Sequence, residues 1–288
     1  RVAGAPRGEG MTIETGLAGY YDRLSWWNGL ARFIGHGGGR EHFTVHRALA
    51  DPSVGGQPTA TRLHDVLRQF LPSGRPIALL DAGCGDGGTM MDLARTHDGN
   101  SLGVTLSARQ VARATAAVHA RGLAARIGVI RASYDQPPAG PFDAIIAIES
   151  LAHSADPAAS IRALSAVLAP GGHLIVVDDM PETDPGDDDL AAFKRGWRCP
   201  VLWPADSYRS AFVARGLDLV AERDLTDEVR PRDAATLARL TRLNRLAHAV
   251  APIPAFRMVM ESHLGGLALE RLYRRGAMRY RLMVASRS

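Results

Sequence analysis

The sequence predicts an α/β fold with a doubly wound, mostly parallel sheet that carries helices on both faces. Three observations lead there. Short apolar runs alternate with stretches of helical spacing, which is typical of strand–helix–strand units. The first of these runs, 77–80, carries no charge and is followed by Asp81 and a glycine turn. The chain closes on an alternating segment, 278–285, which predicts a last strand.

The core elements follow from the apolar periodicity. Leu63, Val66, Leu67 and Phe70 share one helical face, so 59–71 is expected to be a helix leading into the first strand. Helical spacing resumes at Thr89, after the glycine turn. The remaining core elements are expected to be a strand at 101–107, a helix to about 121, strands at 126–131 and 141–148, a helix at 157–168 and a strand at 173–178.

The flanking segments are less regular. Residues 17–58 concentrate aromatic side chains and are expected to be an N-terminal helical lid, or a staple that holds such a helix to the core. An acidic loop is expected at 179–189, a helix at 207–215 and a strand at 217–225. The predicted organisation is a disordered or vector-derived tail at 1–16, the lid at 17–58, a core at 59–231, a helical cap at 232–275 and a last core strand at 276–288.

Length and composition restrict the expected domain size and the expected cellular location. The 288 residues, 46% of them hydrophobic, can build one large domain with a lid. Cys84 and Cys199 lie far apart and form no metal or disulfide pattern, and neither a secretory signal nor an apolar run of membrane-spanning length is visible. These features predict a cytoplasmic protein with no membrane partner, and a homo-oligomer is left open.

Arginine supplies nearly all the positive charge. Lys194 is the one lysine among 34 basic residues, and 230–288 holds twelve arginines against three acids. A GC-rich genome explains the bias; the functional alternative is a positive field that holds a phosphate or carboxylate. No basic motif interleaved with aromatic residues is present, so nucleic acid is not an expected partner.

The glycine turn is compatible with either of two kinds of cofactor. Gly83, Gly85 and Gly88 spell G-x-G-x-x-G, but a dinucleotide site also needs an acid about twenty residues further on. The strand at 101–107 ends without a carboxylate. Asp81 would instead repel a pyrophosphate, whereas it suits a ligand with an ammonium group and a sulfonium. A turn that merely tightens the strand–helix joint is the alternative without a ligand.

The pattern D-x-G-x-G-x-G from Asp81 resembles the S-adenosylmethionine (SAM) dependent methyltransferases of the Rossmann-like fold. Thr105 and Gln110, in the stretch Val-Thr-Leu-Ser at 104–107 and just beyond it, resemble the branch that contains cyclopropane fatty acid synthase and tocopherol methyltransferase. The turn Pro-Gly-Gly at 170–172 is similar to the general family turn, and 203–208 and 224–231 resemble acceptor-side segments of that branch. The resemblance implies a seven-stranded sheet with the last strand inserted antiparallel.

The resemblance also implies cofactor contacts, taken over by motif position. The methionine part of SAM would lie at the glycine turn, the ribose and adenine at the second strand, and the adenine edge beyond the third strand. The implied SAM-binding residues are Asp81, Gly83, Cys84, Gly85, Thr105, Leu106, Gln110, Ser133, Tyr134 and Glu149.

Glu149 and His153 form the candidate catalytic pair. They follow the fourth strand, beside the expected sulfonium, and a helical turn would place them on one face. A carboxylate there can accept a proton or stabilise a positive centre. The alternative is that Glu149 caps the next helix and His153 lies on the surface.

The expected acceptor is an apolar anion. The chain resembles terpenoid C-methyltransferases, which implies methylation of the alkene of a prenyl diphosphate (isopentenyl, geranyl or farnesyl), with Mg²⁺ assisting the diphosphate although no protein metal site is expected. The rival interpretations are a small-molecule O- or N-methyltransferase, lipid cyclopropanation and a non-enzymatic SAM-binding partner. The expected acceptor-binding residues are Tyr20, Tyr21, Trp26, His46, Trp203 and Tyr208.

Overall fold

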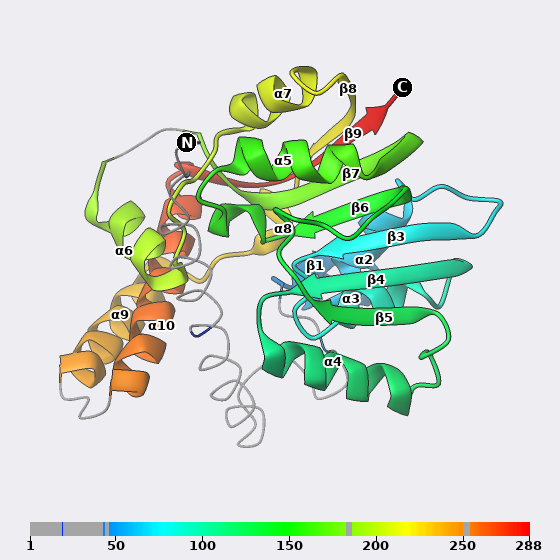
Figure 1. Cartoon of the computed structure of the whole chain (residues 1–288). Helices are drawn as coiled ribbons and strands as arrows, with labels where there is room; N and C mark the ends of the chain where they lie inside the picture. The colour runs from blue at the N-terminus through cyan, green and yellow to red at the C-terminus, as the bar shows by residue number, and fades with distance from the viewer. Residues whose placement is uncertain (1–18, 20–42, 44–45, 183–185, 250–253) are drawn as a thin grey trace, which may run out of the picture.

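The centre of the molecule is a seven-stranded sheet with the order β5-β4-β3-β6-β7-β9-β8 (Figure 1). The computed structural model describes residues 19, 43, 46–182, 186–249 and 254–288. Neighbouring strands run parallel except β9, which is antiparallel to both β7 and β8. The α/β prediction and the antiparallel last strand are therefore confirmed. The strands of this sheet are β3 (Ile77–Ala82), β4 (Gly99–Thr105), β5 (Ile127–Arg131), β6 (Phe142–Ile148), β7 (Leu168–Pro181), β8 (Leu217–Asp224) and β9 (Met278–Arg287).

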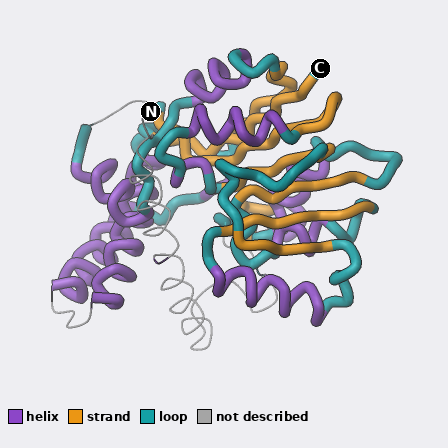
Figure 2. Tube along the Cα trace, in the orientation of Figure 1, coloured by secondary structure: helices purple, strands orange, loops and turns teal. Residues whose placement is uncertain are grey.

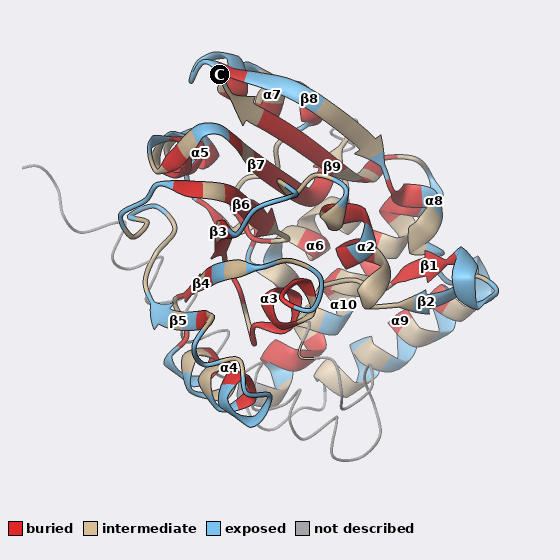
Figure 3. Cartoon of the chain, turned by 90° about the vertical axis from the view of Figure 1, so that its right-hand side faces the viewer, coloured by how far each residue is buried: buried red, intermediate tan, exposed pale blue. Residues whose placement is uncertain are grey.

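Helices cover both faces of this sheet, so successive strand residues enter different cores. Leu79 and Ile146 pack toward one face, whereas Leu80 and Ile145 pack toward the other. The first face is covered by α2 (Thr61–Arg68), α3 (Gly88–Leu93) and α4 (Ala108–Ala120). The second is covered by α5 (Pro157–Ala166) and α7 (Ala205–Val213) (Figure 2). Burial on both faces explains why the central strands β3, β6 and β7 contain almost uninterrupted apolar runs (Figure 3).

A helical cap lies beside the carboxyl ends of the parallel strands (Figure 1). It consists of α6 (Asp188–Trp197), α9 (Ala234–Ala249) and α10 (Pro254–Arg274), and a short helix, α8 (Thr226–Val229), links β8 to it. The helices α6 and α10 cross closely at two glycines, because a Cβ on Gly196 would lie 2.9 Å from the Cα of Gly265. None of the helices in the described ranges is both long and apolar enough to cross a bilayer.

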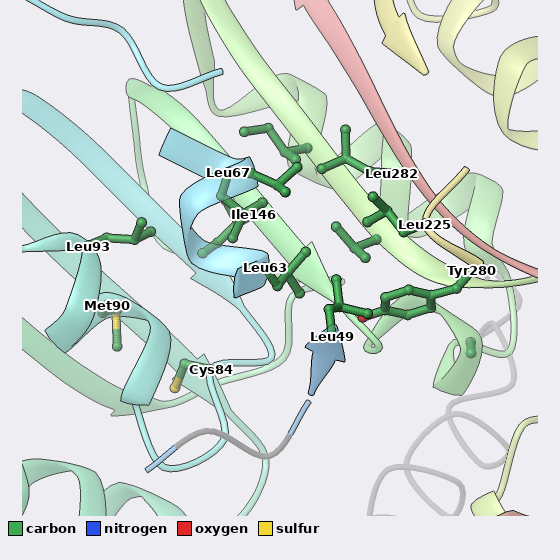
Figure 4. Packing of buried hydrophobic residues seen from close by; sticks show 14 of the residues in the cluster. Leu49, Leu63, Leu67, Cys84, Met90, Leu93, Ile146, Leu225, Tyr280 and Leu282 are labelled. Carbon is green, nitrogen blue, oxygen red and sulfur yellow. The ribbon is translucent and has the colours of Figure 1, made fainter. Parts of the chain in front are cut away.

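The described end of the expected N-terminal lid is a hairpin instead of a helix. It contains β1 (Leu49–Asp51), a 3-10 turn, η1 (Pro52–Val54), and the antiparallel β2 (Gln57–Thr59). The Asp51 carboxylate accepts the backbone N–H and the hydroxyl of Ser53, which favours a turn over a helix. Leu49 is fully buried and lies beside the Tyr280 ring (Figure 4). The hairpin is thereby anchored to β9.

The predicted acidic loop at 179–189 is wrong at both ends. Strand β7 pairs with β9 as far as Pro181, so Asp178 and Asp179 belong to the sheet. Helix α6 then begins at Asp188, and the Asp187 side chain caps it by accepting from two backbone N–H groups. The acidic run is a helix start, where carboxylates face the positive end of the helix dipole.

The close crossing of α6 and α10 makes a stability prediction. A Gly196→Ala Cβ would lie 2.4 Å from the backbone oxygen of Glu261, so we expect the free energy of unfolding to fall by about 1–3 kcal/mol. Gly266→Ala in α10 is the matched control, because its Cβ would lie 3.8 Å from Trp197, in ordinary contact. Denaturant titration measures both, and equal unfolding midpoints would contradict the close crossing.

Candidate functional site

The glycine turn after β3 is held tightly against two neighbouring strands. The amides of Gly83 and Cys84 both donate to the Val104 oxygen at 3.0 Å. Gly83 has φ +103°, and a Cβ there would lie 2.6 Å from the Cβ of Ser150. Gly85 is also left-handed, at φ +53°. This turn therefore requires glycine for both its conformation and its close approach to the end of β6.

The Cys84 side chain faces the core. A contact of Cys84 with the cofactor stays a prediction, and it would involve the backbone of this residue. It is 8% exposed and belongs to the cluster under α3 (Figure 4). Its sulfur would lie 2.7 Å from a Cβ on Gly103, which explains that glycine in β4. The backbone of Cys84 thus shapes the turn, while its thiol is covered.

Asp81 is a buried acid at the carboxyl end of β3. It is 3% exposed, and no hydrogen bond reaches its carboxylate from the described part of the chain. Burial raises its pKa to about 7. Next to Gly83, the Ser150 hydroxyl is also buried, and it has no hydrogen-bond partner among the described residues. An unpaired acceptor and an unpaired hydroxyl next to a glycine turn suit a ligand with a cationic polar end.

The second-strand pair lies at the expected edge but bonds to itself. The Thr105 hydroxyl donates to the Gln110 Oε1 at 2.6 Å, and both side chains are buried. Ser107 caps α4 by accepting the Gln110 amide at 3.1 Å. The Leu106 oxygen accepts from Arg131 at 3.1 Å. Contact of Thr105, Leu106 and Gln110 with a ribose or adenine stays a prediction.

The residues after β5 tie this edge together. The Tyr134 hydroxyl donates to the Ser150 oxygen at 2.9 Å, and Ser133 Oγ accepts the Asp135 amide at 3.2 Å. Tyr134 thus joins the loop after β5 to the end of β6. The structure brings both residues to the predicted edge, and their adenine contacts stay a prediction.

Glu149 stands at the end of β6 and is held from three parts of the chain. Its backbone is left-handed, at φ +48°, a conformation that costs energy for a residue with a side chain. Its amide donates to the Val177 oxygen at 2.8 Å. Its Oε1 accepts the Arg47 amide at 3.0 Å and the Tyr280 hydroxyl at 2.9 Å. The carboxylate is therefore fixed toward the carboxyl edge of the sheet.

The guanidinium of Arg47 fills an aromatic box beside this carboxylate. Its carbon lies 5.0 and 5.3 Å from the ring centroids of Tyr280 and Tyr273. The Trp197 ring of α6 lies 5.6 Å away. Arg47 also donates to Asp179 at 2.9 Å, and its buried Nε has no hydrogen-bond partner within the described part of the chain. The arrangement stabilises one positive charge away from water.

Asp178 and Asp179 on β7 are both buried, and this burial shifts their pKa values. Burial raises the pKa of Asp179 to about 6, although Arg47 opposes that rise. Burial and the neighbouring Asp179 together raise the pKa of Asp178 well above its usual range. Burial alone would lower the pKa of Arg47, but Asp179 and other nearby groups raise it instead. The guanidinium therefore stays charged.

His153 does not share a helical face with Glu149, contrary to the prediction. The short turn η2 (Leu151–His153) is 3-10 and starts after the left-handed Glu149. The His153 Nδ1 lies 3.4 Å from the Arg198 oxygen, and burial lowers its pKa. A neutral ring is the result, and its catalytic role stays a prediction.

The predicted acceptor residues divide into three groups. Tyr208 is 2% exposed and packs in the core under α7, with Trp203 5.4 Å away between ring centroids, so Tyr208 is structural. His46 lies beside Glu149 in a hydrogen-bonded chain with His64. Tyr20, Tyr21 and Trp26 lie outside the described residues.

Several side chains at the site were not predicted from the sequence. Aromatic residues make up 6% of the chain, and that rarity is the one signal that could have drawn attention to these rings. The two adjacent acids near the end of a strand, Asp178 and Asp179, are a further weak signal for the site. Within the described ranges, no cluster of three metal-ligating side chains is present. The missed residues are Arg47, His64, Asp92, Asp179, Trp197, Tyr273 and Tyr280.

The family comparison agrees with this site. A family described as a methyltransferase domain matches residues 58–222, more than half of the chain, so the chain belongs to that family. An O-methyltransferase of Pyrenophora dematioidea is 30% identical over 171 residues, which cover 58% of this chain and 63% of that protein. Ajmaline N-methyltransferase of Rauvolfia serpentina is 25% identical over 236 residues, or 75% of this chain and 78% of that protein. The first match thus spans less than two thirds of its relative's length.

Solved structures show the same fold. The [4+2]-cyclase SpnF has a TM-score of 0.73 at 24% identity and covers 94% of both chains. Geranyl diphosphate C-methyltransferase from Streptomyces coelicolor A3(2), solved with Mg²⁺, geranyl diphosphate and S-adenosyl-L-homocysteine, has a TM-score of 0.71 at 18% identity and covers 99% of this chain and 100% of that one. These likenesses confirm the Rossmann-like methyltransferase fold.

The prediction of a SAM-dependent methyltransferase is therefore confirmed at the level of the class. The residues present fit the cofactor, since the buried Asp81 carboxylate and the Ser150 hydroxyl, which has no hydrogen-bond partner among the described residues, lie at a turn that admits glycine alone at position 83. Asp81 would hold the ammonium group, and the glycine backbone would approach the sulfur end.

The raised pKa of Asp81 predicts how cofactor affinity depends on pH. Its carboxyl is protonated below its pKa of about 7, so a ligand with an ammonium group must displace a proton there. We expect the affinity for S-adenosylhomocysteine to rise about tenfold per pH unit up to that value and then to level off. Calorimetry between about pH 5.5 and 7.5 measures this slope.

Asp81→Asn should bind more weakly and without the slope. Asp98→Asn, an exposed acid beyond α3, should keep it. A wild-type affinity that is flat across this range would show that Asp81 does not meet the ammonium group.

Proposed function

We propose that the chain is a C-methyltransferase that adds the methyl group of SAM to the alkene of a prenyl diphosphate. The observation that carries the proposal is the box of Tyr280, Tyr273 and Trp197 around a buried cation, with Glu149 and Asp179 at its edge. These rings and acids already hold one positive charge, on Arg47, away from water, and the acids at the edge of the box would also stabilise a positive charge on carbon that would be short-lived in water.

The chemistry follows from where these groups lie. Bound SAM supplies an electrophilic methyl group on a sulfonium. The alkene π pair would form the new carbon–carbon bond to this methyl group while the sulfur keeps the electron pair of its bond to the methyl, so the neighbouring alkene carbon would become cationic. Aromatic faces contribute on the order of 1–2 kcal/mol each to stabilising such a desolvated charge. Glu149 then accepts the proton from an adjacent carbon, and the C–H electrons restore an alkene.

Charge limits where the diphosphate can bind. The Arg47 guanidinium is already balanced by Asp179 and lies 3.6 Å from Glu149. The cap supplies other cations: Arg242 and Arg245 line a groove of about 490 Å³ with Thr241 and have no side-chain partner in the described ranges. We infer that cap arginines, with Mg²⁺, hold the diphosphate. The geranyl diphosphate enzyme named above was solved with both Mg²⁺ and its diphosphate, which supports this assignment.

A second candidate is O- or N-methylation of a small molecule. Two carboxylates face one arginine at the site, and that excess of negative charge also suits an amine acceptor. The O- and N-methyltransferases among the relatives support the same alternative. In this case Glu149 or His153 would take the proton of a phenol or amine.

Product analysis separates the two candidates. The chain is incubated with SAM and, in turn, isopentenyl, geranyl and farnesyl diphosphate, and the products are dephosphorylated and analysed by mass spectrometry. We expect at least one prenyl alcohol to gain one CH₂ in mass on its carbon skeleton. Methylation of a phenol or amine panel, with every prenyl diphosphate unchanged, would replace the first candidate by the second.

Glu149→Gln tests the carboxylate itself. The amide keeps the size and the bond from Tyr280 but cannot accept a proton, so we expect kcat to fall by about 10²–10⁴ with unchanged affinity for S-adenosylhomocysteine. Glu261→Gln, an exposed acid on α10 that is 44% accessible, is the matched control and should turn over normally. Undiminished turnover in Glu149→Gln would remove the residue from the mechanism.

A further inference from the structure

A chain of three side chains runs from α3 to the segment that holds Glu149. His64 of α2 lies with its Nδ1 2.9 Å from the Oδ2 of Asp92 and its Nε2 2.8 Å from the Nε2 of His46. The His46 Nδ1 lies 2.9 Å from the Arg47 oxygen. The two rings meet edge to face, with centroids 4.9 Å apart, and His64 is 1% exposed.

The number of protons that these hydrogen bonds require determines the charge of the two histidine rings. The Asp92 carboxylate and the Arg47 carbonyl only accept, so the Nδ1 of each ring must carry a proton. The contact between the two Nε2 atoms, at 2.8 Å, requires one further proton. Three protons on two imidazole rings make one imidazolium and one neutral ring.

The hydrogen-bond geometry and the states of its two neighbours assign the extra proton to His64. Burial, helped by the nearby His64, lowers the pKa of His46 to about 4, so that ring is neutral at physiological pH. Burial alone would raise the pKa of Asp92, but His64 and Arg68 lower it to about 2, so that carboxylate is charged. His64 then donates on both sides, to Asp92 and to His46.

We propose that His64 is a positioning residue, whose imidazolium fixes His46 and thereby holds the Arg47 backbone against Glu149. The residue after His46 donates its amide to the Glu149 Oε1 at 3.0 Å. Two residues further on, Leu49 is buried beside Tyr280, the other donor to that oxygen (Figure 4). Both bonds to Glu149 thus depend on the path of this short segment.

Loss of the shared proton should release the segment. Without it, two nitrogen lone pairs would face each other across the contact between His46 and His64, which favours separation. The inference rests on the proposed role of Glu149, but the contact itself can be measured without any acceptor. The charged or titratable groups that surround the two rings are Asp92, Arg68, Arg47 and Glu149.

The protonation state is tested by nitrogen NMR on the full chain with labelled histidine. From the hydrogen-bond geometry we expect one ring with both nitrogens protonated, whose Nε2–H also couples to the Nε2 of a second, neutral ring. The signals disappear in His64→Gln. Two neutral rings, or no coupling between them, would overturn the proposal whether or not the acceptor is a prenyl diphosphate.

The positioning role is tested by hydrogen exchange of the Arg47 amide. In the wild type we expect the Arg47 amide to be protected. In His64→Leu we expect the protection to fall at least tenfold at neutral pH, while the β6 and β7 amides are unaffected. His64→Gln, whose amide can still donate to His46, should recover part of the protection.

Turnover supplies the last readout, with whichever acceptor the enzyme uses. We expect kcat to drop at least tenfold in His64→Leu, while affinity for S-adenosylhomocysteine is unchanged. His97→Gln is the matched control, since that histidine sits beyond α3, bonds to the Leu93 oxygen and touches none of the site. Unchanged Arg47 protection in His64→Leu would reduce His64 to a core residue, even if Glu149 proved catalytic.

Discussion

The half-buried carboxylate of Glu149 is the constraint on which the site depends. A charge removed from water must be met by donors, or it destabilises the fold. Here the donors come from positions 47 and 280, at the two ends of the described chain, and meet at the end of β6. The segment that leads into the hairpin and the antiparallel last strand must both be in place before this acid is satisfied.

The two halves of the site follow different physical rules. The cofactor half depends on the backbone, since Gly83 must adopt a left-handed conformation and approach Ser150 closely. The half that we propose for the acceptor depends on side chains, which enclose the Arg47 guanidinium in aromatic faces. A backbone turn tolerates little variation, whereas a box of side chains can be rebuilt for another acceptor. The class of enzyme is therefore better defined than the molecule it methylates.

The comparisons illustrate the same division. Structures with nearly the same fold include a cyclase and a prenyl diphosphate C-methyltransferase. Sequence relatives are O- and N-methyltransferases. The fold positions a sulfonium at one edge, and the reaction is set by what surrounds it. The acids and rings near Arg47 are thus the part of this chain that carries information about the acceptor.

The sequence alone determined the sheet, the glycine turn and the acid at its tip, because apolar periodicity and glycine conformation act over a few neighbouring residues. It also brought out Glu149, whose place at a strand end is local. It could not reveal Arg47, Tyr273 and Tyr280 as its neighbours, since those contacts join residues more than a hundred positions apart. Nor could it show that Tyr208 packs in the core or that 179–189 holds a strand end and a helix start, because pairing with β9 and packing of the cap decide both.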